Sequence, residues 1–245
     1  MSPLLIPLAI ILILVSVLFL RTMWKWQEQR LKKLKDFAEQ MGMEFSEKGD
    51  SALLESLSAF DLFSKSRTKS TSFSGVKITN VLYGDSEQLG YGEEFEVRIL
   101  ECTQDIGEDG QVHQTVICFR SPHLSLPDFS MRPEHVFHKI GSVLGYQDID
   151  FESHPTAAEF SKKYLLRGKD EQKIRVLFTD KVLTFFAAHP DVGNGHLPFW
   201  HWSQHMVCVE GSGDQLILYR DGIRIKPEDI PAFMKEGFEV FRLFI

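Results

Sequence analysis

The sequence predicts an α+β protein in which an N-terminal transmembrane helix precedes one cytoplasmic domain, built from an antiparallel sheet and packed amphipathic helices. Three observations lead to this fold class. Residues 3–20 carry no charge, several later segments alternate as half-buried strands do, and the C-terminal segment repeats apolar side chains at helical spacing. The expected division is a transmembrane anchor at 1–22, a juxtamembrane amphipathic helix at 23–43 and a cytoplasmic α+β domain of unknown function at 44–245.

The N-terminal run "PLLIPLAIILILVSVLFL" (3–20) is long enough to cross a hydrocarbon core of about 30 Å as a helix. A cleaved secretory signal is the alternative. No positive charge precedes the run and no small-residue cleavage site follows it, so a retained anchor in the lipid bilayer is favoured.

The flanks of this run predict its orientation. No side-chain charge precedes it, whereas basic residues follow it closely, which by the positive-inside rule places the N-terminus outside and the C-terminal domain in the cytoplasm. The expected residues of the membrane interface are Arg21, Trp24, Lys25 and Trp26. The predicted location is a single-pass position in the plasma membrane.

The composition limits the function classes. Residues 1–35 hold six Lys and Arg against one acidic residue, so the 21 basic and 33 acidic residues of the remainder leave a charge of −12. Such an acidic body repels nucleic acid, which excludes nucleic-acid binding. The three cysteines, Cys102, Cys118 and Cys208, are odd in number and lack metal-ligand spacing, which indicates buried, reduced thiols in a reducing compartment.

Two helices and a loop are expected first. Residues 26–41 have apolar residues at near-helical spacing, either continuous with the membrane span or after a short break. A short helix is expected at 52–59, with Asp50 or Ser51 as its N-cap. Residues 64–75 are polar and predict an exposed loop; the alternative is a contact of its basic residues with lipid phosphates.

Strands follow at 76–83, 94–102 and 112–119, which are rich in β-branched and aromatic residues and predict an antiparallel meander. Residues 121–133 then read as a proline-punctuated connection. Pro133 is expected to open a helix that runs to Leu144.

The C-terminal half predicts a strand at 160–168 and two helices capped by Asp170 and Thr179. The turn at 211–214, "GSGD", lies between two apolar segments and predicts a hairpin. Residues 227–229 open a final helix with a continuous apolar stripe, typical of a core helix.

Several motifs taken in order resemble a family of bacterial proteins. They are "LPDFSMRPE", "DIDFESHP", "FSKKYLLRGKDE" and "VEGSGDQLILYR" with "KPEDIPAF". Members of this family are short proteins, usually with an N-terminal membrane segment, that carry one domain of unknown function. The resemblance covers most of 28–245 outside the histidine-rich loop. It implies a bacterial inner-membrane protein and assigns no active residue.

A carboxylate cluster is the first candidate site. In an extended "QDIDFES", Asp148, Asp150 and Glu152 lie on one side of the chain, where hard oxygens suit Mg²⁺ or Ca²⁺. A solvent-facing strand edge gives the same alternation and is favoured.

Histidines form the second candidate. In 189–205 only His201 and His205 are expected to act together on a metal; an aromatic contact or a self-packed loop are the alternatives. His135 and His138, three apart on an expected helix, are a weaker pair.

Two arginines, Arg132 and Arg167, are expected in structural ion pairs, with an anion-binding pocket as the alternative. No nucleotide-binding loop, nucleophile elbow or zinc-protease motif is present.

The sequence therefore favours a membrane-tethered, non-catalytic binding or assembly module with no cofactor and with a protein partner. A metal-dependent hydrolase using the carboxylate cluster or the histidines is one alternative. A lipid-handling domain at the inner membrane face is the other, and it predicts an apolar cavity.

Overall fold

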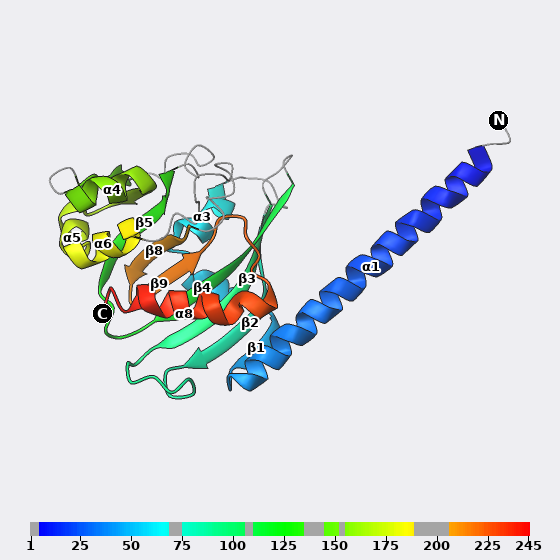
Figure 1. The fold of residues 1–245 in the computed structure, drawn as a ribbon, viewed down its shortest axis with the longest axis horizontal. Coiled ribbons are helices and arrows are strands. Elements are labelled where there is room, and N and C mark those ends of the chain that lie inside the picture. The colour runs from blue at the N-terminus through cyan, green and yellow to red at the C-terminus, as the bar shows by residue number, and fades with distance from the viewer. Residues whose placement is uncertain (1–4, 69–74, 106–109, 135–144, 152–154, 189–205) are drawn as a thin grey trace.

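A computed structural model describes residues 5–68, 75–105, 110–134, 145–151, 155–188 and 206–245. A nine-stranded, wholly antiparallel sheet forms the middle layer, and helices cover both of its faces (Figure 1). The strands lie in the order β1-β2-β3-β4-β9-β8-β5-β7-β6. Their bounds are β1 Glu44–Lys48, β2 Val76–Asp85, β3 Glu96–Asp105, β4 Gln111–Arg120, β5 Leu126–Pro133, β6 Gln147–Asp148, β7 Tyr164–Gly168, β8 Cys208–Gly213 and β9 Gln215–Tyr219.

The C-terminal hairpin occupies the centre of this sheet. The predicted meander pairs as β2-β3-β4, and β9 then pairs with β4 through residues such as Ile117 and Leu218. Strand β8 pairs with β5 on the other side, for example Met131 with Val209. Hairpin β8-β9 therefore joins the N-terminal strands to the group β5-β7-β6, and the hairpin predicted around 211–214 is confirmed.

Alternation along the central strands divides the apolar side chains between two cores. Ile99 and Ile117 face the core on one side of the sheet, whereas Leu100 and Cys118 face the other. The first core is covered by α1 (Leu5–Gln40), α8 (Ile230–Phe241) and the group α4 (Pro155–Lys163), α5 (Glu171–Leu177) and α6 (Asp180–Ala188). The second lies under α2 (Ser51–Ser56) and α3 (Asp61–Thr68).

Helix α8 is the main cover of the first core, as its apolar stripe predicts. A one-turn 3-10 helix, η3 (Pro227–Asp229), precedes it. The rings of Phe238 and Phe241 pack on Phe119 of β4 with centroids 5.2 and 4.9 Å apart, and Phe241 also contacts Phe95. These contacts fix α8 over β4.

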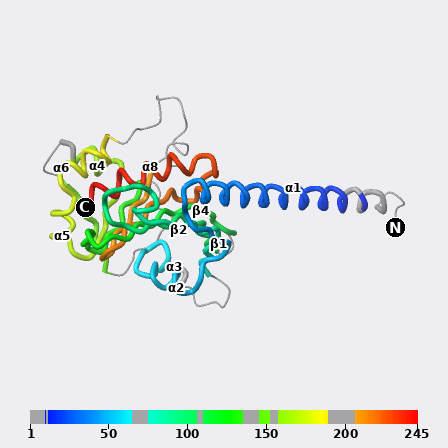
Figure 2. The backbone as a smooth tube through the Cα atoms, turned by 90° about the horizontal axis from the view of Figure 1, so that it is seen from below, coloured from blue at the N-terminus to red at the C-terminus, as the bar shows by residue number. Residues whose placement is uncertain are grey.

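Helix α1 is one unbroken helix that runs far beyond the domain (Figures 1 and 2). Its C-terminal part packs on the first core through Leu34, Phe37 and Ala38. Residues 12–20 of the part that projects expose apolar side chains around the helix, apart from Ser16: Leu18 is 62 % and Phe19 64 % accessible.

The transmembrane prediction is corrected by this structure. In the part of the chain that the structure describes, no helix combines the length and the apolar character needed to cross a membrane. The described apolar run of α1 ends at Arg21, and the helix continues as a charged segment that packs on the sheet. This finding overturns the transmembrane fold class, the single-pass keyword and the predicted place in the inner membrane.

Two local predictions were also wrong. Residues 126–133 form strand β5 and not a connection, and Pro133 ends this strand opposite Tyr164. Proline is tolerated there because Pro133 is the last residue of β5, beyond the point at which the pairing with β8 stops at Met131. Residues 160–163 are the last turn of α4, so the strand predicted at 160–168 begins only at Tyr164.

Other boundaries hold or shift slightly. The carboxylates of Asp50 and Asp170 accept hydrogen bonds from Leu53 N and Lys173 N, which confirms both as N-caps. Helix α3 extends to Thr68, so the loop predicted at 64–75 starts later. The helix expected up to Leu144 falls on 135–144, outside the described residues.

The three cysteines are free and buried, as predicted. Burial raises the pKa of each thiol to about 12. Because the thiolate is the reactive form, we expect none of the three to react with a chromogenic disulfide reagent at about pH 8 in the folded chain. The same assay in denaturing urea should titrate all three, and rapid labelling of the native chain would contradict this burial.

Candidate functional site

An open groove of about 450 Å³ lies where the free part of α1 meets the domain. One wall is α1, and the other is the segment that leads into η3. The lining combines apolar, basic and other polar side chains: Met23, Trp26, Gln27, Gln29, Arg30, Lys33, Arg224, Lys226, Pro227 and Glu228.

Helical spacing brings the α1 side chains to one wall. Trp26, Arg30 and Lys33 are four and three residues apart, so they lie on one face of the helix. The opposite wall is extended, and Arg224 and Lys226 flank the buried Ile225.

Strand β4 holds that extended wall in place. Thr115 N donates to Ile223 O at 3.0 Å, and Ile225 N donates to Thr115 Oγ1 at 3.0 Å. The two arginines of the groove therefore come from elements that are independently fixed, one by α1 packing and one by these bonds.

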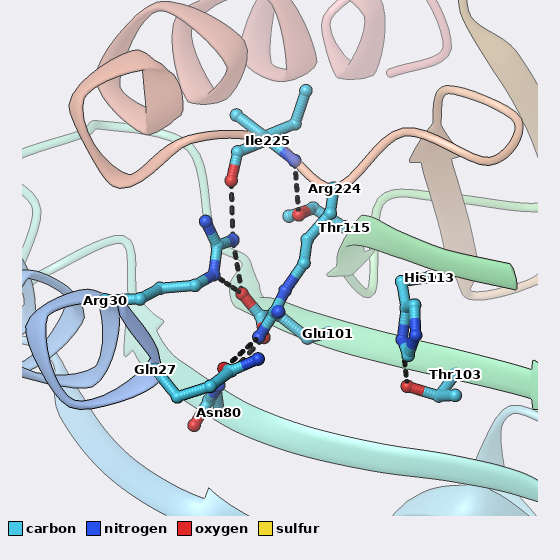
Figure 3. A network of polar contacts seen from close by, with 9 residues as sticks. All are labelled: Gln27, Arg30, Asn80, Glu101, Thr103, His113, Thr115, Arg224 and Ile225. Atoms are coloured by element: carbon cyan, nitrogen blue, oxygen red, sulfur yellow. Dashed lines mark hydrogen bonds and ion pairs between the residues drawn. The ribbon is translucent and has the colours of Figure 1, made fainter. Parts of the chain in front are cut away.

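Glu101 of β3 joins the two walls (Figure 3). Arg30 Nε donates to Glu101 Oε1 at 2.7 Å, and Arg30 Nη2 donates to Ile225 O at 2.6 Å. Arg224 Nε donates to Glu101 Oε2 at 3.0 Å. Both arginines also pair with the same carboxylate through Nη2. This network fastens α1 to the sheet and to the loop before α8.

Asn80 completes the network from β2. Its Nδ2 donates to Glu101 Oε2 at 2.8 Å. Asn80 has φ 51°, a left-handed conformation that a side chain other than glycine adopts at a cost, and it lies in a register irregularity between Thr79 and Leu82. The irregularity turns the amide toward the carboxylate.

The charge state of Glu101 follows from these contacts. Burial alone would raise its pKa, but hydrogen bonds and the positive charges of Arg224 and Arg30 outweigh burial and lower it. Glu101 is therefore ionised at neutral pH. Two cations share one anion, so the network keeps a net positive charge at the base of the groove.

A second charged cluster lies under α3 on the opposite face of the sheet. Arg132 Nη2 contacts Asp61 Oδ2 at 2.6 Å and Glu210 Oε1 at 2.7 Å, and Arg132 Nε donates to Ser130 Oγ. Burial raises the pKa of Tyr219, so its hydroxyl stays protonated and donates to Glu210 Oε1 at 2.7 Å. All of these side chains are buried, which makes this cluster structural.

A smaller hollow of about 390 Å³ lies over the ends of β2, β3 and β4. There the hydroxyl of Thr103 lies 2.9 Å from His113 Nδ1, as Figure 3 shows. Its lining borders 69–74 and 106–109, outside the described residues.

The structure places only part of the predicted metal site. Asp148 and Asp150 are exposed on either side of the buried Ile149, as the alternation predicts. Asp148 Oδ1 pairs with Arg167 Nε at 2.5 Å, so Arg167 is in an ion pair. Glu152 lies outside the described residues, and its role stays a prediction.

The predicted histidine sites are not described. His135, His138, His201 and His205 all fall in 135–144 and 189–205. Within the residues that are described, no group of three His, Cys, Asp or Glu side chains is arranged to hold a metal ion.

The expected interface residues lie on α1, and one of them enters the groove. Trp24 and Trp26 are 73 % and 71 % exposed, and Trp26 lines the groove. Sequence reasoning missed Glu101 and Arg224. The signal was present for Glu101, because it shares the strand face of Val97 and Ile99, where a carboxylate is out of place without a cation.

Comparison with known proteins finds a solved structure with a similar fold. No protein-family model and no curated protein matches the chain. The chain is similar to the crystal structure of the mycobacterial trehalose monomycolate transport factor A, TtfA, with a TM-score of 0.51 and 12 % identity over 88 % of this chain and 92 % of that chain. At this identity the likeness concerns the fold alone, and the resemblance to a bacterial family stays a prediction.

Proposed function

We propose that this protein is a non-catalytic binding protein for a lipid-like amphiphile, a molecule with an apolar chain and a polar head. The observation that carries the proposal is the continuity of two surfaces on one helix. The exposed apolar part of α1 leads directly into the groove at its foot, through Met23 and Trp26.

The apolar part of α1 is the binding surface for the chain. Leu12 to Leu20 expose apolar side chains around the helix, interrupted only by Ser16. Ser16 Oγ bonds to Leu12 O within the helix, so it adds little polarity. A contiguous apolar surface of this kind marks an interaction site, because its burial removes apolar area from water.

The groove is the site for the polar head. It has both an apolar entrance and polar walls, which is the lining expected of a pocket that orients an amphiphile. The fold supports the same class of function: the similar protein TtfA is, by its name, a transport factor for trehalose monomycolate. That particular ligand is not carried over to this chain.

Binding of a brominated single-chain amphiphile, kept below its critical micelle concentration, tests the proposal on the full chain. Bromine quenches tryptophan at short range, so we expect quenching that is lost when Trp24 and Trp26 are replaced by phenylalanine. Replacing Leu18 and Phe19 with glutamine should weaken binding at least tenfold, because each buried apolar side chain contributes about 1.5–3 kcal/mol. Both side chains are exposed, so the fold should be unaffected.

Val176→Gln is the matched control. Val176 is also an exposed apolar residue, at 79 %, but it lies on α5, and its replacement should leave the affinity unchanged. The proposal would be refuted if all these variants bound the amphiphile with the same affinity, or if the wild-type chain did not bind it.

A further inference from the structure

The groove holds more positive than negative charge, although the chain as a whole carries −7. Its four cations are Arg30, Lys33, Arg224 and Lys226. Against them stand Glu228, which lines the groove, and Glu101 behind it, so the net charge is +2.

The arginines keep donors for a ligand. A guanidinium has five N–H donors, and Arg30 and Arg224 direct Nε and Nη2 into the network around Glu101. Among the described residues, neither Arg30 nor Arg224 donates a hydrogen bond through Nη1. Both guanidinium groups are held in place by the same carboxylate, so their positions are set before any ligand arrives.

The lysines add charge that is weakly compensated. Lys33 Nζ lies 3.5 Å from Glu228 Oε2, a long contact between exposed groups. Lys226 forms no ion pair with the described residues. The two lysines line the groove from opposite walls.

We infer that the groove binds a phosphate group, whose two negative charges match the net +2 of the groove lining and Glu101 taken together, and whose oxygens can accept hydrogen bonds from Nη1 of the two fixed guanidinium groups. This inference rests on the proposed function, in which the phosphate is the head of the amphiphile. A phosphate without an apolar chain would use the same four cations, so the experiment separates the two sources.

The test compares three ligands on the full chain by titration calorimetry: an alkyl phosphate, a neutral alkyl glycoside of the same chain length, and inorganic phosphate. We expect the alkyl phosphate to bind most tightly. The double variant Lys33→Gln/Lys226→Gln should weaken its binding about tenfold, as expected for two charges near a solvated anion, and leave the glycoside unchanged. Both lysines are exposed, so folding should be retained.

Lys181→Gln is the control, because Lys181 is an exposed lysine on α6, away from the groove. If the glycoside binds as tightly as the alkyl phosphate, or if the double variant weakens both equally, the phosphate site is refuted while the amphiphile proposal stands. If inorganic phosphate binds as tightly as the alkyl phosphate, the phosphate site stands and the amphiphile proposal falls. If none of the three binds, both fall.

Discussion

Replacing Glu101 with glutamine should lower the free energy of unfolding by about 3–5 kcal/mol, because it leaves the partly buried guanidinium groups of two arginines without their counter-charge. Glu101 is 5 % exposed and is the common partner of Arg30 and Arg224. Glutamine keeps the shape, but its amide nitrogen replaces one of the two acceptor oxygens, so the loss comes from both the charge and the hydrogen bonds. The change should also loosen the attachment of α1, which this network fastens to the loop before α8.

The pH dependence of this effect has a definite sign. The pKa of Glu101 in the folded chain is lowered from 4.5. Its contribution to stability is therefore fully present above 4.5 and is lost as the pH falls through the folded value. The difference in the free energy of unfolding between the wild type and Glu101→Gln should be largest at neutral pH and should vanish in acid.

Urea denaturation of both chains at several pH values measures the effect. Glu47→Gln is the control, because Glu47 forms an ion pair with Lys35 that is exposed to solvent. That variant should unfold at the wild-type urea concentration. An equally stable Glu101→Gln chain at neutral pH would show that the network does not stabilise the fold.

Replacing Arg132 with methionine should cost about 3–5 kcal/mol, since it removes the guanidinium that contacts the buried carboxylates of both Asp61 and Glu210. Like charges in a desolvated site favour protonation, so the folded variant should bind protons that the unfolded chain releases. The loss in free energy of unfolding of this variant, relative to the wild type, should therefore become smaller as the pH falls from about 7 to about 5.

The triple variant Arg132→Met/Asp61→Asn/Glu210→Gln separates charge from packing. With both carboxylates replaced by neutral amides, no buried negative charge is left that needs the arginine. The triple variant should therefore recover most of the free energy of unfolding that Arg132→Met loses. Urea denaturation of the single and triple variants provides the comparison. A triple variant as unstable as Arg132→Met would mean that packing around the guanidinium, and not charge, holds this part of the sheet.

Sequence patterns predicted the elements better than their arrangement. The period-two alternation of β3, the glycine turn between β8 and β9 and the apolar stripe of α8 are local signals, and each led to an observed element. Asp50 and Asp170 were identifiable as caps because a carboxylate that bonds its own helix needs no distant partner.

The order of the strands was not predictable from such signals. Pairing of β4 with β9 and of β5 with β8 depends on which distant edges meet. Residues 126–133 were misread as a connection because their prolines are typical of loops, whereas the strand is defined by pairing with the distant β7 and β8. The groove was missed because its walls, at Arg30 and Arg224, are far apart in the chain.

The central position of the β8-β9 hairpin sets the order in which the molecule can be completed during synthesis. Strands β1 to β4 and the group β5, β6 and β7 leave the ribosome first, as two partial sheets that are not neighbours in the finished sheet. Until 208–219 emerge, β4 and β5 each present an open edge with the apolar rows of Val116–Phe119 and Phe129–Met131. The nascent chain therefore carries its greatest risk of aggregation just before its last strands are made, and a chaperone that shields strand edges would act at that stage.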